Sequence, residues 1–279
     1  MANKNYNYTN RILAAITFFI SFAVYYDTMA PTVSYWDCGE FIAVSHTLGV
    51  PHPPGSPLYL LLGRVASMLP IGEDIAFRVN LLSPIVSSFS VLFLYLIIVQ
   101  MVNHWRGKIS SPTDALIVFG SGIIGSLTFA FTDSHWFNAV EAEVYAFSTF
   151  FTAIVVWLIL VWNEKADEKG NERYILLIAY MIGLATGLHL LNLLTIPFIA
   201  LVIYFRKFEF GFESFGITII LTGFVFFIIH NVIIKGMPKI AAAIGIPMTG
   251  FLVFGVFGVM VWSVINKEKL LSILFTSLV

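Results

Sequence analysis

Long apolar blocks separated by short polar segments limit the fold of this chain more than any other feature. A hydrocarbon core of about 30 Å requires about 20 apolar residues per spanning helix. We expect about eight spans, at 12–30, 79–103, 114–132, 144–163, 174–189, 190–205, 214–234 and 244–265, and a ninth that begins near Leu270 and is cut off by the chain end. The sequence therefore predicts an all-α polytopic membrane protein, a single transmembrane domain over 1–279 that is truncated at its C-terminus.

Composition agrees with this class. Hydrophobic residues make up 58% of the chain and charged residues 11%, whereas a soluble domain usually carries about 25% charged residues. The formal net charge of -1 gives no reason to expect a nucleic-acid partner. Cys38 has no second cysteine with which to form an internal disulfide.

The stretch 174–205 fits either one long tilted helix or two short helices hinged near 187–192. With two helices, 11 of the 15 basic residues fall on the N-terminal side. The other four are Arg64, Arg78, Lys235 and Lys239. The positive-inside rule then predicts a cytoplasmic N-terminus and an extracytoplasmic loop at 31–78.

This first loop is long and contains two apolar stretches, 37–48 and 56–69, which we interpret as interfacial helices. Loops of this length in a compact protein are usually functional. The HPPGSP segment between the two stretches predicts a stiff turn that holds His52 over the membrane surface, with Ser56 capping the next helix.

Asp37 and Glu40 have two interpretations. Their D-x-x-E spacing is that of a capping box, in which each side chain bonds a backbone N–H of the first turn. Trp36 and Phe41 would instead seat the helix at the membrane boundary, where partial desolvation raises the basicity of a carboxylate. Perturbed carboxylates that face a cleft favour a catalytic role.

Other polar residues near the outer face also have two interpretations. Arg64 and Arg78 could bind phosphate bidentately or snorkel to lipid headgroups. Glu141 and Glu143 could interact favourably with the dipole of the helix that begins at Val144, or they could belong to a functional site.

Polar residues within the apolar blocks are fewer. His189 and Asn192 lie in the 174–205 stretch, so we expect them to face protein or a water-filled cavity. GSGIIG at 120–125 has no strand before it and lies in a predicted span, so it is not a dinucleotide site. The Gly183 and Gly187 pair predicts close helix packing.

Four segments resemble the GT-C superfamily of membrane glycosyltransferases, in its protein O-mannosyltransferase-like branch. They are YWDCGEFIAVSHTLGVPHPPGSPLY at 35–59, RVNLLSP at 78–84, FNAVEAEVYAF at 137–147 and GLATGLHLLNLL at 183–194. The resemblance implies a GT-C-type helical bundle whose large first extracytoplasmic loop carries two surface helices. It also implies a polyprenyl-phosphate-linked sugar as donor and an acidic residue of the first loop at the reaction centre, a position that Asp37 matches.

We expect Asp37 to act as general base while a hexose such as mannose passes to a protein hydroxyl or glycan. The residues expected to bind substrate are Glu40, His46, His52, Arg64, Arg78, Glu141, Glu143, His189 and Asn192. No ligand spacing demands a metal, although side chains that could hold a divalent ion are present. The partners expected are membrane lipid, the lipid-linked sugar and the acceptor, in a bacterial inner membrane. The alternatives are a transporter or flippase and a non-catalytic scaffold.

Overall fold

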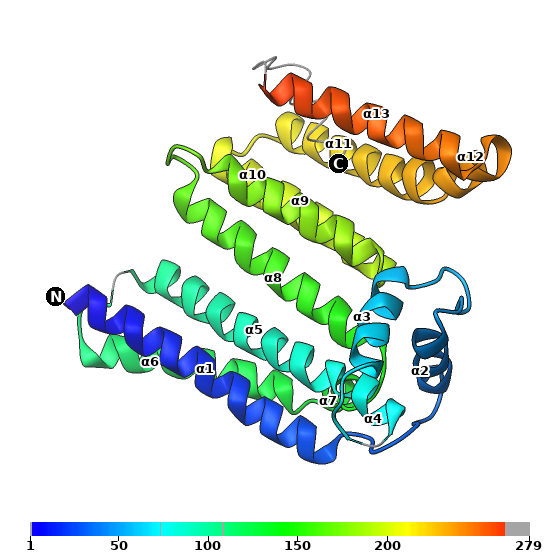
Figure 1. The fold of residues 1–279 in the computed structure, drawn as a ribbon. Helices are drawn as coiled ribbons and strands as arrows, with labels where there is room; N and C mark the ends of the chain where they lie inside the picture. Colours follow the sequence, from blue (N-terminus) through cyan, green and yellow to red (C-terminus); the bar gives the residue numbers. More distant parts are fainter. Residues whose placement is uncertain (1, 73, 108, 266–279) are drawn as a thin grey trace. The chain divides into compact units, whose positions relative to one another are not determined.

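The computed structural model describes residues 2–72, 74–107 and 109–265, and every regular element in these ranges is a helix (Figure 1). The elements in chain order are α1 (Ala2–Thr28), α2 (Cys38–Thr47), α3 (Pro57–Ser67), α4 (Ile75–Asn80), α5 (Leu82–Arg106), α6 (Pro112–Ala130), α7 (Asp133–Ala139), α8 (Val144–Lys165), α9 (Glu172–Thr186), η1 (Leu190–Leu194), α10 (Thr195–Lys207), α11 (Phe212–Phe227), η2 (Ile228–Ile234), α12 (Gly236–Ile244) and α13 (Ile246–Ile265). The all-α prediction is confirmed for these residues.

Six stretches of helix in the described ranges are long and apolar enough to cross a membrane, which confirms the polytopic class. They are Tyr6–Thr28, Ile75–Arg106, Pro112–Ala130, Val144–Lys165, Leu190–Lys207 and Phe212–Ile244. The span expected at 174–189 corresponds to α9, which has 15 residues, fewer than a perpendicular crossing requires. The count of eight spans stays a prediction, and the ninth lies outside the described residues.

The chain divides into two compact units. Unit 1 comprises Met1–Lys165 and Met181–Asn192, and unit 2 comprises Ala166–Tyr180 and Leu193–Val279. Each unit is described by itself below.

Four long helices form the body of unit 1. In Figure 1, α1 and α6 run in one direction and α5 and α8 run back, and α5 contacts the other three. All four therefore bring their ends to the same two edges of the unit. We call the edge that carries α2, α3, α4 and α7 the loop end, and the opposite edge the N-terminal end.

Close packing of α6 against α5 explains the glycine-rich GSGIIG segment. A Cβ atom at Gly122 would lie 2.6 Å from Val99, and one at Gly125 would lie 2.6 Å from Ile98. Real Cβ atoms do not approach so closely, so a larger residue at Gly122 would force Val99 and Tyr95 to move, whereas at Gly125 the end of the flexible Ile98 side chain could adjust. The segment therefore packs α6 against α5.

Of the Gly183 and Gly187 pair, for which close packing was predicted, only Gly187 lies at a close contact: a Cβ there would meet Leu58 at 3.2 Å, whereas one at Gly183 meets nothing within 4 Å in the described part of the chain.

The two helices expected in the first loop are both present as α2 and α3. They pack closely because Gly63 lies against Ser45, where a Cβ would meet the serine Oγ at 2.5 Å. Tyr59 and Phe41 from these helices pack with Phe147 of α8 in one buried cluster. The predicted helix cap at Ser56 is wrong: no N–H of α3 bonds its hydroxyl, which instead donates to the Leu188 carbonyl at 2.9 Å.

The stretch 174–205 contains two helices rather than one, which is the alternative that the charge distribution favours. Helix α9 ends at Thr186, the 3₁₀ helix η1 follows, and α10 begins at Thr195. The Leu58 N–H donates to the Gly187 carbonyl at 2.9 Å within unit 1. This contact binds the break between the helices to the start of α3.

Unit 2 is held by contacts between its own helices, and α10 packs against α11. The hydroxyls of Tyr204 and Ser214 lie 2.8 Å apart, and the Tyr204 hydroxyl also accepts the Gly211 N–H at 3.1 Å. Arg206 forms an ion pair with Asp167, which joins the end of α10 to the segment after α8. These contacts fix the turn between α10 and α11.

Candidate functional site

The candidate site begins where the chain leaves α1 at the loop end of unit 1. The buried Asn80 side chain donates to the carbonyls of Ala30 and Thr32, at 2.8 and 2.9 Å. The Ala30 N–H donates to the Val140 carbonyl at 2.9 Å. These bonds attach the segment before Asp37 to α4 and to the residues that precede α8.

Asp37 stands at the start of α2, directly after a residue in an unusual conformation. Trp36 has a φ of 57°, in the left-handed region that few residues other than glycine adopt. Asp37 is the N-cap residue, but its side chain accepts no capping hydrogen bond. The capping-box interpretation is therefore wrong, and the Asp37 carboxylate is exposed to solvent.

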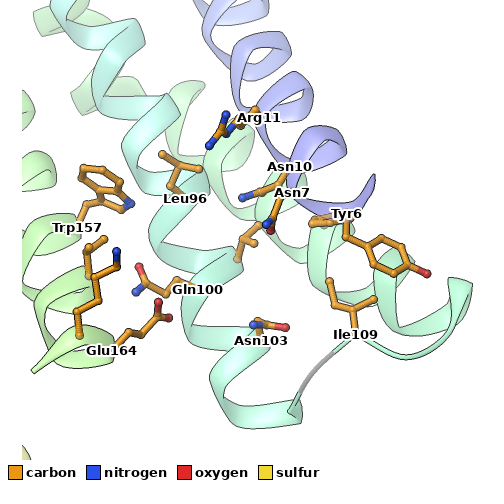
Figure 2. A pocket seen from close by; sticks show the side chains of 14 residues that line it. Tyr6, Asn7, Asn10, Arg11, Leu96, Gln100, Asn103, Ile109, Trp157 and Glu164 are labelled. Carbon is orange, nitrogen blue, oxygen red and sulfur yellow. The ribbon is translucent and has the colours of Figure 1, made fainter. Parts of the chain in front are cut away.

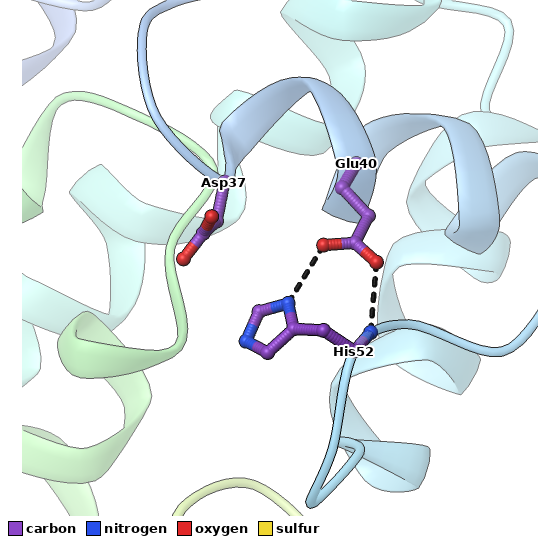
Figure 3. Close-up of side chains that lie close together, drawn as sticks. All are labelled: Asp37, Glu40 and His52. Carbon is purple, nitrogen blue, oxygen red and sulfur yellow. Dashed lines mark hydrogen bonds and ion pairs between the residues drawn. The ribbon is translucent and has the colours of Figure 1, made fainter.

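Glu40 binds His52 rather than the N-terminus of its own helix (Figure 3). One carboxylate oxygen accepts the backbone N–H of His52 and the other faces ring Nδ1, both at 2.7 Å. The hydrogen bond from Glu40 raises the pKa of the His52 ring, and the charges of Asp37 and Glu143 act in the same direction. The same contacts lower the pKa of Glu40, so the geometry favours an imidazolium.

The Asp37 carboxylate lies beside this pair (Figure 3). One ligand atom from each of Asp37, Glu40 and His52 lies within 4.8 Å of the other two. Two carboxylates and an imidazole could hold a divalent cation, because hard cations bind carboxylate oxygens. The ion pair between Glu40 and His52 accounts for most of this geometry without a metal.

A buried layer lies behind the exposed group. Glu143 is 6% exposed, and its side chain accepts the Val144 N–H at 3.1 Å. Burial raises the pKa of Glu143 to about 7, and the negative charges of Asp37 and Glu141 add to this effect. Glu143 thus exchanges a proton near neutral pH, next to a carboxylate that stays in water.

Two further residues of this layer pack against the glutamates. The Ser34 hydroxyl donates to Glu141 at 2.5 Å, which connects the segment before Asp37 to that before α8. Cys38 is fully buried, and its burial and the charges of Glu141 and Glu143 raise the pKa of its thiol. The thiol therefore stays protonated and is a poor nucleophile.

His46 and Arg64 form a separate contact at the far end of α2. Arg64 donates to the His46 carbonyl, and the His46 ring faces the Ser67 hydroxyl at 3.4 Å. The guanidinium thus donates a hydrogen bond to a carbonyl at the C-terminus of α2, where the helix dipole favours a cation.

Arg78 is bound to the loop between α3 and α4. Its three guanidinium nitrogens donate to the carbonyls of Ile71, Ser67 and Gly72, at 2.8, 3.1 and 2.9 Å. This arginine stabilises the loop backbone, and its role toward phosphate stays a prediction.

Asn192 faces α8, as the sequence predicts for a polar residue in an apolar stretch. It is 2% exposed, accepts from the Thr152 hydroxyl at 3.1 Å and donates to the Ser148 hydroxyl at 3.1 Å. The His189 ring lies 5.1 Å from that of Tyr145, and burial lowers its pKa. Both residues thus contact α8, Asn192 from η1 and His189 from the residue before it.

Three residues that shape the site were not predicted from the sequence: Ser34, Tyr59 and Asn80. Tyr59 is fully buried, which raises the pKa of its hydroxyl, and the nearby charge of Glu143 adds to this effect. A tyrosine near a membrane boundary usually indicates an interfacial anchor, so the sequence around Tyr59 does not indicate a role in the site. The sequence around Asn80 does indicate one, because a carboxamide within the RVNLLSP segment needs hydrogen-bond partners once the helix is buried.

The arrangement can perform acid–base chemistry. It offers one exposed carboxylate, one imidazole biased toward the cation and one carboxyl group that titrates near neutral pH. Such a set can accept a proton from a hydroxyl and face an anion at the same time.

Comparison with known proteins gives matches over this same region. The family described as Protein O-mannosyl-transferase TMEM260 N-terminal domain matches residues 37–211. The chain is 32% identical over 203 residues to Protein O-mannosyl-transferase tmem260 of Dictyostelium discoideum. The aligned region covers 67% of this chain and 23% of that protein. It is 28% identical over 164 residues to Protein O-mannosyl-transferase TMEM260 of Mus musculus, which covers 58% of this chain and 21% of that protein.

The chain thus aligns with about a quarter of the length of these relatives or less. No solved structure matches it.

Proposed function

The chain belongs to the family of the protein O-mannosyl-transferase TMEM260 N-terminal domain, and from this premise we propose that it takes part in transferring a sugar to a protein hydroxyl. The sugar is mannose or a similar hexose, and the acceptor is a protein or a glycan on it. The donor is a polyprenyl-phosphate sugar, whose isoprenoid tail fits a chain with six candidate membrane spans in its described part.

One observation carries the proposal: Asp37 begins α2 with an exposed carboxylate that caps no helix. An N-terminal carboxylate without a capping bond contributes little to the stability of its helix. This carboxylate lies at the loop end of the membrane-spanning helices (Figure 1), where a lipid-borne substrate and a water-borne acceptor can meet.

In the proposed reaction the acceptor hydroxyl attacks the anomeric carbon of the sugar. Its proton passes to Asp37 as the new glycosidic bond forms. The bond between the anomeric carbon and the phosphate oxygen breaks, and the phosphate leaves with the electron pair. The configuration at the anomeric carbon inverts, because attack and departure take place on opposite faces of the sugar.

His52 is the cation proposed to meet the leaving phosphate. It belongs to the same three-residue cluster as Asp37, and Glu40 biases it toward the imidazolium form. Arg64 and Arg78 were the other candidates, but both donate to backbone carbonyls. Glu143, whose pKa lies near 7, is proposed to bind sugar hydroxyls or to position the acceptor.

We propose that the site faces the extracytoplasmic side. If the stretch 174–205 crosses the membrane twice, eleven of the 15 basic residues fall on the side of the N-terminus, which the positive-inside rule assigns to the cytoplasm. The prediction of a bacterial inner membrane rests on the sequence alone, and the two relatives named above are eukaryotic.

Incubation of the membrane protein with radiolabelled polyprenyl-phosphate sugars and an acceptor protein tests the activity. The proposal expects label from one of the sugars to move to the protein. Label that stays on the lipid, together with flux of a substrate across sealed vesicles, would support a transporter instead.

A further inference from the structure

A concave region lies at the N-terminal end of unit 1, at the opposite end of the helices from Asp37. It is a cavity of about 510 Å³ between the first turns of α1 and the last turns of α5 and α8 (Figure 2). This volume is within the range of about 300–1,000 Å³ that is usual for small-molecule sites. The transfer reaction proposed above makes no use of this cavity.

Four carboxamides line the cavity, and we therefore call it the amide cavity. They are Asn7, Asn10, Gln100 and Asn103. A carboxamide offers two N–H donors and one acceptor oxygen, so it suits ligands rich in hydroxyl groups. At the ends of membrane spans such a concentration of amides is unusual unless they have polar partners.

One side-chain oxygen of Asn10 lacks a hydrogen-bond partner among the described residues. This atom, Oδ1, is buried. Buried polar atoms are nearly always hydrogen-bonded, because an unpaired one carries a desolvation cost. A ligand hydroxyl or an ordered water in the cavity would satisfy this atom.

Charged side chains complete the lining. Arg11 of α1 and Lys165 of α8 approach the cavity from two sides, and Glu164 lies next to Lys165. In Figure 2, Arg11 and Asn10 point from α1 toward α5, and Glu164 points from α8 toward Gln100. A guanidinium binds phosphate oxygens bidentately, and a carboxylate accepts hydrogen bonds from hydroxyl groups. The cavity therefore offers partners for both the phosphate and the hydroxyls of a phosphorylated polyol.

An aromatic ring supports the same ligand class. Trp157 of α8 lines the cavity on the side of Glu164. The C–H faces of sugars and cyclitols are apolar, and an indole provides apolar surface with an N–H at its edge. An apolar ligand such as a sterol would leave the buried Asn10 Oδ1 atom without a hydrogen bond, which disfavours such a ligand.

We propose that the amide cavity binds a phosphate ester that carries a hydroxyl-rich group. The phosphate lies at Arg11 and Lys165, and the hydroxyls bond the carboxamides and Glu164. The ester is either a lipid headgroup of the phosphatidylinositol kind or a soluble sugar or cyclitol phosphate. The chemistry is the same for both sources.

Native mass spectrometry of the full chain in detergent, with phosphatidylinositol and phosphatidylcholine as probes, tests the lipid source. Thermal shift with inositol 1-phosphate tests the soluble source. We expect one of these two phosphoinositol probes to bind at least about tenfold more tightly than phosphatidylcholine, the equivalent of about 1.4 kcal/mol. Binding at the same level as phosphatidylcholine, by both probes, would overturn the proposal.

Variants locate the binding. Arg11→Gln and, separately, Asn10→Leu should each weaken binding of the preferred probe by about tenfold or more, because each substitution removes a polar group that binds the ligand. Arg106→Gln is the matched control, since Arg106 also lies at the N-terminal end but pairs with Asp114 and does not line the cavity. Unchanged binding in both cavity variants, or equal loss in the control, would contradict the assignment.

Two further measurements separate this result from other effects. Gln100→Leu serves as a third cavity variant if either of the first two lowers the melting temperature. Sugar transfer by Asp37→Asn is measured independently, and this variant should bind the probe normally. Loss of probe binding in Asp37→Asn would contradict a separate site.

Discussion

Glu40 contacts His52 through two bonds of 2.7 Å, one from the backbone N–H and one at ring Nδ1. This two-point contact fixes both the main chain and the ring of His52 relative to α2. Because Asp37 begins the same helix, the contact also sets the separation between the exposed carboxylate and the imidazole. The relative positions of the proposed base and cation thus depend on a residue that performs neither role.

Glu40→Gln should change the pH dependence of transfer. The hydrogen bond and charge of Glu40 raise the pKa of His52, so the imidazolium persists to higher pH in the native protein than in the variant. Transfer should therefore decline at a lower pH in Glu40→Gln than in the native protein. Rate profiles between pH 5 and pH 9 test this. A decline at the same pH in both proteins would exclude His52⁺ as the group that faces phosphate.

Glu143→Gln should make stability less dependent on pH. The pKa of Glu143 is raised from 4.5 to about 7, so the folded protein holds this proton more tightly than the unfolded chain. The protonated Glu143 therefore contributes to the free energy of unfolding. This stabilisation is fully present below pH 4.5 and is lost as the pH rises through about 7.

The melting temperature of the native protein in detergent should fall between pH 5 and pH 8, and that of Glu143→Gln should fall about 3 °C less. The exposed Glu213→Gln, in the first turn of α11, is the control and should follow the native protein. A fall of equal size in Glu143→Gln would show that Glu143 does not titrate in this range.

Gly63→Ala should destabilise the contact between α2 and α3. The new Cβ would meet Ser45 Oγ at 2.5 Å and its Cβ at 2.8 Å, so a helix has to move, at a cost of about 1–3 kcal/mol. Gly183→Ala is the matched control, because a Cβ there meets nothing within 4 Å and alanine favours a helix by up to about 1 kcal/mol. Denaturation in detergent measures both. Equal stability of the two variants would contradict the close α2–α3 packing.

The membrane-spanning fold was predictable because apolar length is a local property of the sequence. Helices α6 and α8 begin within a few residues of the predicted spans at 114–132 and 144–163. The 3₁₀ turn after α9 was predictable only as one of two alternatives, since polar residues such as Asn192 suit either a hinge or a helix face that contacts α8. Hydropathy does not distinguish between them.

Asp37, Glu40 and His52 could be selected from the sequence as candidates, but the contacts between them could not be predicted. Asp37 and Glu40 are three residues apart, so either a capping box or a shared helix face fits the spacing. Glu40 binds His52 instead, across 12 residues that include a turn, and this depends on the path of the loop. Arg78 illustrates the same limit, because no local pattern reveals that backbone carbonyls of its own loop accept its guanidinium.

Asp37→Asn provides the most direct test of the account. The substitution removes the basic carboxylate and keeps the size of the side chain, so transfer from a polyprenyl-phosphate sugar should fall about 100-fold or more. The melting temperature should not change, because Asp37 makes no capping bond. Asp133→Asn, another exposed carboxylate at the loop end, should leave transfer intact. As a stability control, Asp74→Ala removes a true cap and should cost about 1 kcal/mol.

The decisive measurement is therefore the initial rate of transfer by Asp37→Asn relative to the native protein, at equal melting temperature. A loss of about 100-fold is the predicted result. A rate within about twofold of the native value would contradict the assignment of Asp37 as the base.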